Sequence, residues 1–168
     1  SANPAVVGVD ILLAESDRFN PKALADLAKD KKNIIEQYFF NGDRILGEVI
    51  SGQPVILATA FNRNSKNTIK NKSQLLIKQK ARFDIPAISG IIFPINEFNG
   101  AEGFGFVNVD LDNADNTVRY LPLLANLNGK IYPSFVLELI RVFEEDKMLN
   151  LDSLGNTFPL NVISTGFT

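Results

Sequence analysis

Acidic side chains follow the first apolar stretch of the chain, in a pattern that could bind a ligand or a cation. Asp10 interrupts the apolar run 5–13 (AVVGVDILL), and Glu15 and Asp17 come shortly after it. The carboxyl end of a parallel strand is where α/β folds usually bind ligands, so Asp10 and Glu15 are candidate ligand residues. The competing interpretation gives these acids a capping or turn-forming role, with one ion pair to Arg18.

Three further candidates lie in the stretch 103–120, GFGFVNVDLDNADNTVRY. Alternation predicts a strand over 103–112 with Gly105, Val107, Val109 and Leu111 on its core face, a turn over 113–116 and a second strand from Thr117. With a four-residue loop, Asp110 faces Arg119 across this hairpin. Asn108, Asp110 and Arg119 are candidate ligand residues. The structural alternative for the last two is a cross-strand ion pair, which stabilises a sheet by about 0.2–1 kcal/mol.

Composition argues against most catalytic classes. The 168 residues include no His and no Cys, which removes the commonest general base, thiol nucleophiles and the usual zinc ligands. The acidic run 110–115 fails as a calcium loop, because an EF-hand needs a ligand, a Gly and a Glu where Ala114, Asp115 and Leu121 stand. No phosphate-binding loop or nucleophile elbow is present. We therefore expect no enzyme, no metal site and no cofactor.

The elements that would position these residues can be placed from turn and periodicity signals. Asn20-Pro21 predicts a helix start, and a second helical pattern over 33–50 is interrupted at Asn41-Gly42. The run 54–61 (PVILATAF) predicts a buried strand, as does the run 5–13. An irregular connection with one short strand is expected over 85–98.

The second half of the chain carries equally local signals. Asn128-Gly129 predicts a tight turn. Pro133 suits the first turn of a helix reaching 146, with Val136, Leu139, Ile140 and Phe143 inward and Glu138, Arg141 and Glu145 outward. The tail from Met148 looks extended, with a last strand over 160–163. The expected fold is α/β or α+β, a mixed and partly antiparallel central sheet with helices packed on it, in a single domain over 1–168.

A basic stretch separates the predicted strands in the middle of the chain. It contains no acid, and its basic residues are Arg63, Lys66, Lys70, Lys72, Lys78, Lys80 and Arg82. It could be a solvated surface excursion, a lid over an anionic ligand, or a contact with anionic lipid headgroups. No aromatic residue interleaves with the basic ones, so stacking on bases is not supported and we expect no nucleic-acid partner.

Several short motifs in the right order are similar to the signature of the type-two CHASE domain, a sensory domain associated with cyclases and histidine kinases. They are G-F-V-N-V-D-x-D at 105–112, V-R-Y-L-P-L at 118–123 and N-G-K-I-Y-P-S-F-V-L-E-L at 128–139. The run around Asp10, with Glu15 and Asp17, matches a further family stretch. Asn116 stands where the family usually has the turn Gly; Asn also reaches positive φ.

The resemblance implies an extracytoplasmic input domain, cut from a longer membrane-tethered bacterial protein, that signals to a cytoplasmic nucleotide cyclase, histidine kinase or Ser/Thr kinase. In the family an additional strand and helix precede the strand that corresponds to the run 5–13. The implied partner is an unidentified small ligand or protein signal, and a homodimer is possible. Two alternatives remain: a small α/β enzyme or nucleotide-binding domain using Asp10 and Glu15, and an interaction module without a small ligand. A deep pocket joining Asn108, Arg119 and Asp10 would favour a ligand sensor, and a shallow apolar patch the interaction module.

Overall fold

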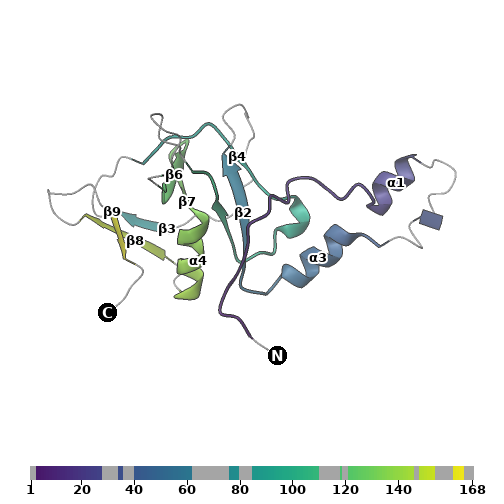
Figure 1. Cartoon of the computed structure of the whole chain (residues 1–168), viewed down its shortest axis with the longest axis horizontal. Coiled ribbons are helices and arrows are strands. Elements are labelled where there is room, and N and C mark those ends of the chain that lie inside the picture. The colour runs from purple at the N-terminus through teal and green to yellow at the C-terminus, as the bar shows by residue number, and fades with distance from the viewer. Residues whose placement is uncertain are drawn as a thin grey trace.

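The structure is a computed structural model, and it describes residues 3–27, 34–35, 40–61, 76–79, 85–109, 118, 121–145, 148–153 and 161–164. It combines helices with a mixed sheet, as the sequence predicts (Figure 1). Among these residues no helix has both the length and the apolar character needed to cross a lipid bilayer.

The central sheet is built around β2 (Val55–Phe61), which is the predicted buried strand. β1 (Val7–Val9) and β5 (Gly103–Phe106) both pair in parallel with the Ile56–Leu57 part of β2, so they lie on opposite sides of it. β4 (Ile91–Ile92) pairs antiparallel with the last two residues of β2, beyond the point where β1 ends. β2 is therefore the one strand through which this sheet is connected.

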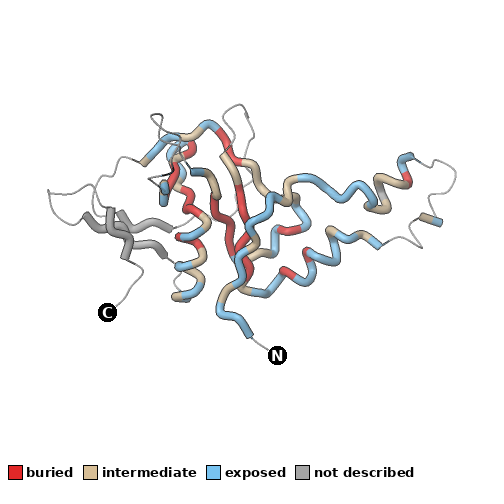
Figure 2. Tube along the Cα trace, in the orientation of Figure 1, coloured by how far each residue is buried: buried red, intermediate tan, exposed pale blue. Residues whose placement is uncertain are grey.

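Two helical layers cover this sheet on opposite faces. On one face, Ile50 of α3 (Gly42–Ile50) and Phe98 of the 3-10 helix η1 (Asn96–Phe98) pack with Val55, Leu57 and Phe104. On the other, α4 (Phe135–Phe143) lies against β5, β2 and β1. Figure 2 shows burial concentrated on β2 and β5, between these layers.

Glycines set how closely α4 approaches the sheet. A Cβ added to Gly105 would lie 2.7 Å from the Phe135 backbone nitrogen and 2.8 Å from the Ser134 carbonyl oxygen. A Cβ on Gly8 would meet the tip of the Phe135 ring at 2.9 Å. α4 therefore rests directly on the backbone of β5, at a distance that a side chain would forbid.

The described parts of the chain contain two further sheets. β6 (Leu124–Leu127) and β7 (Lys130–Pro133) form a hairpin across Asn128 and Gly129, whose φ angles are 53° and 84°. Positive φ at both central residues is the type I′ geometry that Asn-Gly favours, so the predicted tight turn is confirmed. β8 (Met148–Ser153) pairs in parallel with β3 (Leu76–Gln79) and antiparallel with β9 (Asn161–Ser164).

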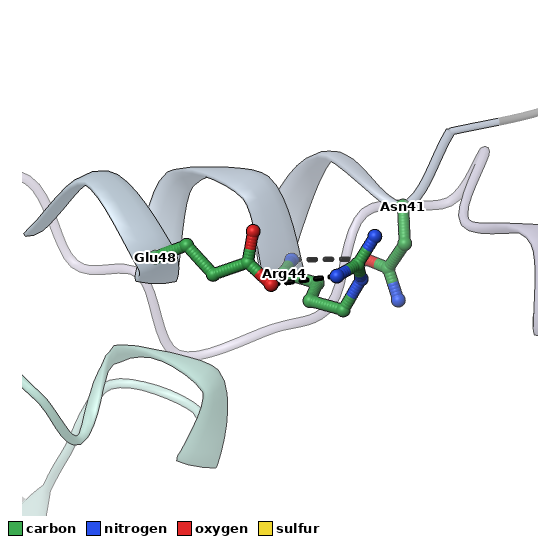
Figure 3. A network of polar contacts seen from close by, with 3 residues as sticks. All are labelled: Asn41, Arg44 and Glu48. Atoms are coloured by element: carbon green, nitrogen blue, oxygen red, sulfur yellow. Dashed lines mark hydrogen bonds and ion pairs between the residues drawn. The ribbon is translucent and has the colours of Figure 1, made fainter. Parts of the chain in front are cut away.

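α1 (Pro21–Leu27) and α3 extend from the sheet to one side as an arm (Figure 1). The Asn20 side chain accepts a hydrogen bond from the Ala23 N–H at 3.1 Å, and that of Asn41 accepts one from the Arg44 N–H at 3.1 Å. The predicted cap at Asn20 is confirmed, and the predicted interruption at Asn41-Gly42 is the beginning of α3, which Asn41 caps (Figure 3).

Four expectations are corrected. The apolar run 5–13 forms only the short strand β1, whose Val7 is 38% exposed, because β1 lies at the edge of the sheet. The strand predicted over 103–112 ends at Phe106 and pairs in parallel with β2, while the predicted partner strand from Thr117 lies almost wholly outside the described residues. Its predicted core face is also wrong in part, since Phe104 and Phe106 are buried while Val109 is exposed. α4 begins after Pro133, which ends β7, and Ser134 caps it.

Candidate functional site

The side chains predicted at the end of β1 are exposed. Asp10 follows β1 directly, and both it and Glu15 lie on the segment that leaves the sheet towards α1. Asp17 has the turn-forming role that was the competing interpretation: one of its carboxylate oxygens accepts from the Phe19 N–H at 3.0 Å. The Asp17 N–H donates to the Asp43 carboxylate at 2.8 Å, which ties this segment to the first turn of α3.

Asn108 joins the carboxyl ends of two parallel strands. Its side-chain oxygen accepts the Phe61 N–H at 2.6 Å, and the Val107 N–H donates to the Thr59 carbonyl at 3.0 Å. The amide of Asn108 thus continues the β2–β5 ladder beyond the last residue of β5. The oxygen that could have faced a ligand is engaged with the backbone.

Asp10 and Asn108 share an edge of the sheet without converging. The register Val9↔Leu57↔Phe104 places Asp10 one step beyond β1, level with Ala58, whereas Asn108 binds Phe61. Three residues of strand span about 10 Å, and two strand spacings add about 10 Å across the sheet. Asp110 and Arg119 lie outside the described residues, so their cross-strand pair stays a prediction, as does most of the basic stretch 63–82.

Glu138 and Arg141, which the helical pattern predicts on the outer face of α4, form a buried ion pair on its inner side. Glu138 is 1% exposed, and its carboxylate accepts two hydrogen bonds from Arg141, at 2.9 Å from Nε and 2.7 Å from Nη2. A Cβ on Gly103 would collide with this carboxylate. The pair is bidentate and lies over a glycine of β5, whereas Val136, Ile140 and Phe143, expected inward, are 46%, 42% and 58% exposed.

The sequence contained one signal for this arrangement. α4 is apolar on nearly all sides, FVLELIRVF, and a helix of that kind has no single face that must be buried. A Glu and an Arg three residues apart in such a helix can neutralise each other, which makes their burial possible.

A cavity of about 390 Å³ opens beside this pair. It lies at the amino ends of β1, β2 and β5 and at the carboxyl end of α4, and its lining comprises Ala5, Gly52, Gln53, Pro54, Glu102, Arg141, Val142 and Glu145. The cavity is therefore at the opposite edge of the sheet from Asp10 and Asn108. Two carboxylates and one guanidinium line it, which suits a small polar ligand that carries a cationic group.

Two other chemical features bear on function. Burial raises the pKa of the Tyr132 phenol above its usual value of 10.0. Its ring packs edge-on against Phe93 with centroids 6.2 Å apart, in the cluster around Ile91 and Leu127. Within the described ranges no three acidic side chains come together as a metal site.

Comparison with known proteins shows which family the chain belongs to. No curated protein and no solved structure matches it. The family model described as the CHASE2 domain matches residues 1–166, which is nearly the whole chain and includes the motifs at 105–112, 118–123 and 128–139. The chain belongs to the CHASE2 domain family, a family of sensory domains.

Proposed function

We propose that this domain is the extracytoplasmic input part of a bacterial transmembrane signalling protein. The observation that carries the proposal is the match of the CHASE2 family model to residues 1–166. The output would be a cytoplasmic nucleotide cyclase, histidine kinase or Ser/Thr kinase. The alternative of an enzyme at Asp10 and Glu15 has less support, because both side chains are exposed and the cavity lies at the other edge of the sheet.

The cavity beside Arg141 is the best candidate for the ligand site. A ligand there would touch the carboxyl end of α4 and the starts of β2 and β5 at once, so its binding energy could favour one placement of α4 over another. Such a ligand shifts the signalling equilibrium only by its difference in affinity for the two arrangements. Glu102 and Glu145 would bind its cationic group, and Arg141 would orient an anionic one if it has both.

The sequence of the gene on both sides of this segment tests the signalling role. We expect an apolar span before it, and apolar spans followed by a cyclase or kinase after it. Because the segment has no Cys, Asp10→Cys adds one exposed thiol to it, and the unsubstituted full protein is the control for any Cys elsewhere. A membrane-impermeant thiol reagent should label it in intact cells. A gene without spans, or a thiol labelled only after lysis, would refute the extracytoplasmic assignment.

Titration with small charged probes tests the ligand site. An organic cation or an amino acid that binds at the cavity should lose affinity at least tenfold in Glu102→Gln, with Glu97→Gln on η1 as the matched control. Equal affinities in the two variants would remove the cavity from consideration and leave the family assignment unaffected.

The interaction module is a second candidate, and one observation favours it. Large apolar side chains are exposed on the arm, including Phe19 at 71%, Leu27 at 83% and Phe40 at 82%. A folded domain rarely leaves so much apolar surface in water without a partner.

A further inference from the structure

Glu145 follows the last turn of α4 in a backbone conformation that suits few residue types. Its φ is 57°, in the left-handed region, and its N–H donates to the Val142 carbonyl at 3.1 Å. Helices often end on such a residue, but it is usually Gly or Asn, because the Cβ of other residues is strained there. Asn128 is the other non-glycine residue with positive φ in the described part of the chain, and its type suits its turn.

The charge of Glu145 also opposes the helix that it ends. The carboxyl end of a helix carries the negative end of the helix dipole, so a carboxylate there is destabilising. Glu144, the C-cap residue, adds a second negative charge at the same end. Strained residues of this kind concentrate at ligand sites. The conformation and the charge of Glu145 together therefore indicate a role for its carboxylate outside the helix.

Glu145 lies on the lining of the cavity beside α4. It borders this space of about 390 Å³ together with Glu102, whose N–H donates to the Val55 carbonyl at 2.9 Å just before β5 begins. Both glutamates are exposed, and neither takes part in the ion pairs that link described residues to one another. Two carboxylates from different elements therefore border one cavity, and no ion pair to a described residue neutralises them.

Arg141 also lines the cavity, but its charge is matched by that of Glu138. Its Nε and Nη2 donate to the Glu138 carboxylate at 2.9 Å and 2.7 Å, and its side chain is 12% exposed. An anionic group of a ligand would have to compete with Glu138 for the guanidinium, and breaking a buried pair is costly. A cationic group meets Glu102 and Glu145 without such competition. The electrostatics of the lining thus favour a ligand that carries positive charge only.

On the proposed role of the cavity as the ligand site, we infer that Glu102 and Glu145 bind the two ammonium groups of a small diamine. Each carboxylate accepts charge-assisted hydrogen bonds from one ammonium group. Ala5, Pro54 and Val142 supply apolar lining for the alkyl chain between the two groups. Calcium fits less well, because it takes about six to eight oxygen ligands and no three acidic side chains of the described residues come together.

Isothermal titration calorimetry with putrescine, a diamine, and with butylamine, its monoamine counterpart, tests the ligand class. We expect the protein to bind putrescine about tenfold or more tightly than butylamine, because the monoamine lacks the second charge-assisted contact. The affinity for putrescine should fall as salt is added, since both carboxylates are exposed. Calcium chloride and free glycine are titrated as the alternative probes.

Substitution of the two carboxylates tests the site. Glu145→Gln and Glu102→Gln should each weaken putrescine binding about tenfold. The matched control is Glu144→Gln, which removes a neighbouring charge from the same helix end but not from the cavity lining, and it should leave the affinity nearly unchanged. Circular dichroism checks that all variants are folded.

Glu145→Gly separates the ligand role from a structural one. Glycine relieves the strain at φ 57° and removes the charge from the end of α4. The midpoint of thermal unfolding without putrescine should therefore rise by about 2–4 °C, while putrescine binding weakens about tenfold. Asn128→Gly is the matched control at the other positive φ, and it should leave the affinity for putrescine unchanged.

Four results would overturn the inference: putrescine that binds no more tightly than butylamine, equal putrescine affinity in Glu145→Gln, a lower unfolding midpoint in Glu145→Gly, and calcium or free glycine that binds the cavity more tightly than putrescine. Binding of free glycine that still depends on Glu102 would keep the cavity as the ligand site and remove only the diamine. The gene sequence tests the signalling role separately, so a failure there is distinguished from a failure here.

Discussion

Glu138 and Arg141 form the buried ion pair of the described residues, so the loss of either side chain should cost electrostatic free energy. Glu138 is 1% exposed and the Arg141 side chain 12%, so each charge depends on the other for compensation. Removing one partner of a buried pair leaves an uncompensated charge, which commonly costs about 3–5 kcal/mol. We expect Arg141→Leu to lower the free energy of unfolding by that amount, as measured by urea denaturation.

Arg44→Leu is the matched control for that measurement. It removes the same residue type from an ion pair of similar length, at 63% exposure, where a pair contributes at most about 0.5 kcal/mol. Equal losses in the two variants would mean that Glu138 is solvated in the folded protein.

Tyr132 predicts a stability change at alkaline pH. Burial raises the pKa of its phenol above 10.0, the value expected in the unfolded chain. The folded state therefore holds this proton more tightly, so the stabilisation is complete below pH 10 and is lost as the pH rises through the folded-state pKa. Tyr132→Phe should flatten the decline in unfolding free energy above pH 10, measured by denaturant titration at several pH values. Other tyrosines and lysines titrate in both proteins and cancel in the difference; identical pH profiles would contradict the prediction.

At the scale of elements, the turn and the helix starts could be predicted from the sequence, whereas the rotation of α4 about its axis could not. The Asn128-Gly129 turn and the caps at Asn20 and Asn41 follow from what these side chains do to their own backbone. The rotation of α4 depends instead on Gly103 and Gly105, which lie on a different strand and leave space for Glu138 and the helix backbone. No pattern within 133–146 contains that information.

The position at which β5 ends also depends on a contact with a different strand. Alternation continues to Asp112, yet the strand stops at Phe106 because the Asn108 side chain takes the place of a backbone partner for Phe61. The pairing that the structure shows for β5 is with β2, a strand more than forty residues earlier in the chain, which no local pattern predicts. Of the predicted site residues that the structure describes, Asn108 therefore has a structural role, and Asp10 lies well away from it.

Two glycine substitutions should separate a tight backbone contact from a tight side-chain contact. Gly105→Ala would place a methyl group against the Phe135 backbone, which cannot move without shifting α4. Overpacking of this kind costs about 1–3 kcal/mol or more. Gly8→Ala meets only the end of the Phe135 ring and the Leu139 side chain, which can adjust, so the smaller loss is expected there. Thermal unfolding of both variants makes the comparison, and a larger loss for Gly8→Ala would show that α4 is held less closely than its contacts indicate.

At the scale of the whole molecule, the sequence located the family but not the edge of the sheet where the cavity lies. The family motifs are local and remain recognisable, whereas the cavity is assembled from Ala5, Gly52 to Pro54, Glu102 and the end of α4. These segments meet only because β1, β2 and β5 run parallel and begin at the same edge. Asp10 and Glu15 were predicted as ligand residues because such sheets usually bind ligands at the carboxyl ends of their strands, whereas the cavity lies at the amino ends.

Amide hydrogen exchange should divide the molecule into a slow centre and a fast arm. β2 has strands on both sides, and Ile56, Leu57 and Ala58 are 0% exposed, so their amides should exchange only through global unfolding. In the described parts of α1 and α3, only Ala25, Gly47 and Ile50 are buried, so amides there should exchange by local opening and far sooner. Amides of α3 as slow as those of β2 would mean that the arm is part of the same cooperative unit as the sheet.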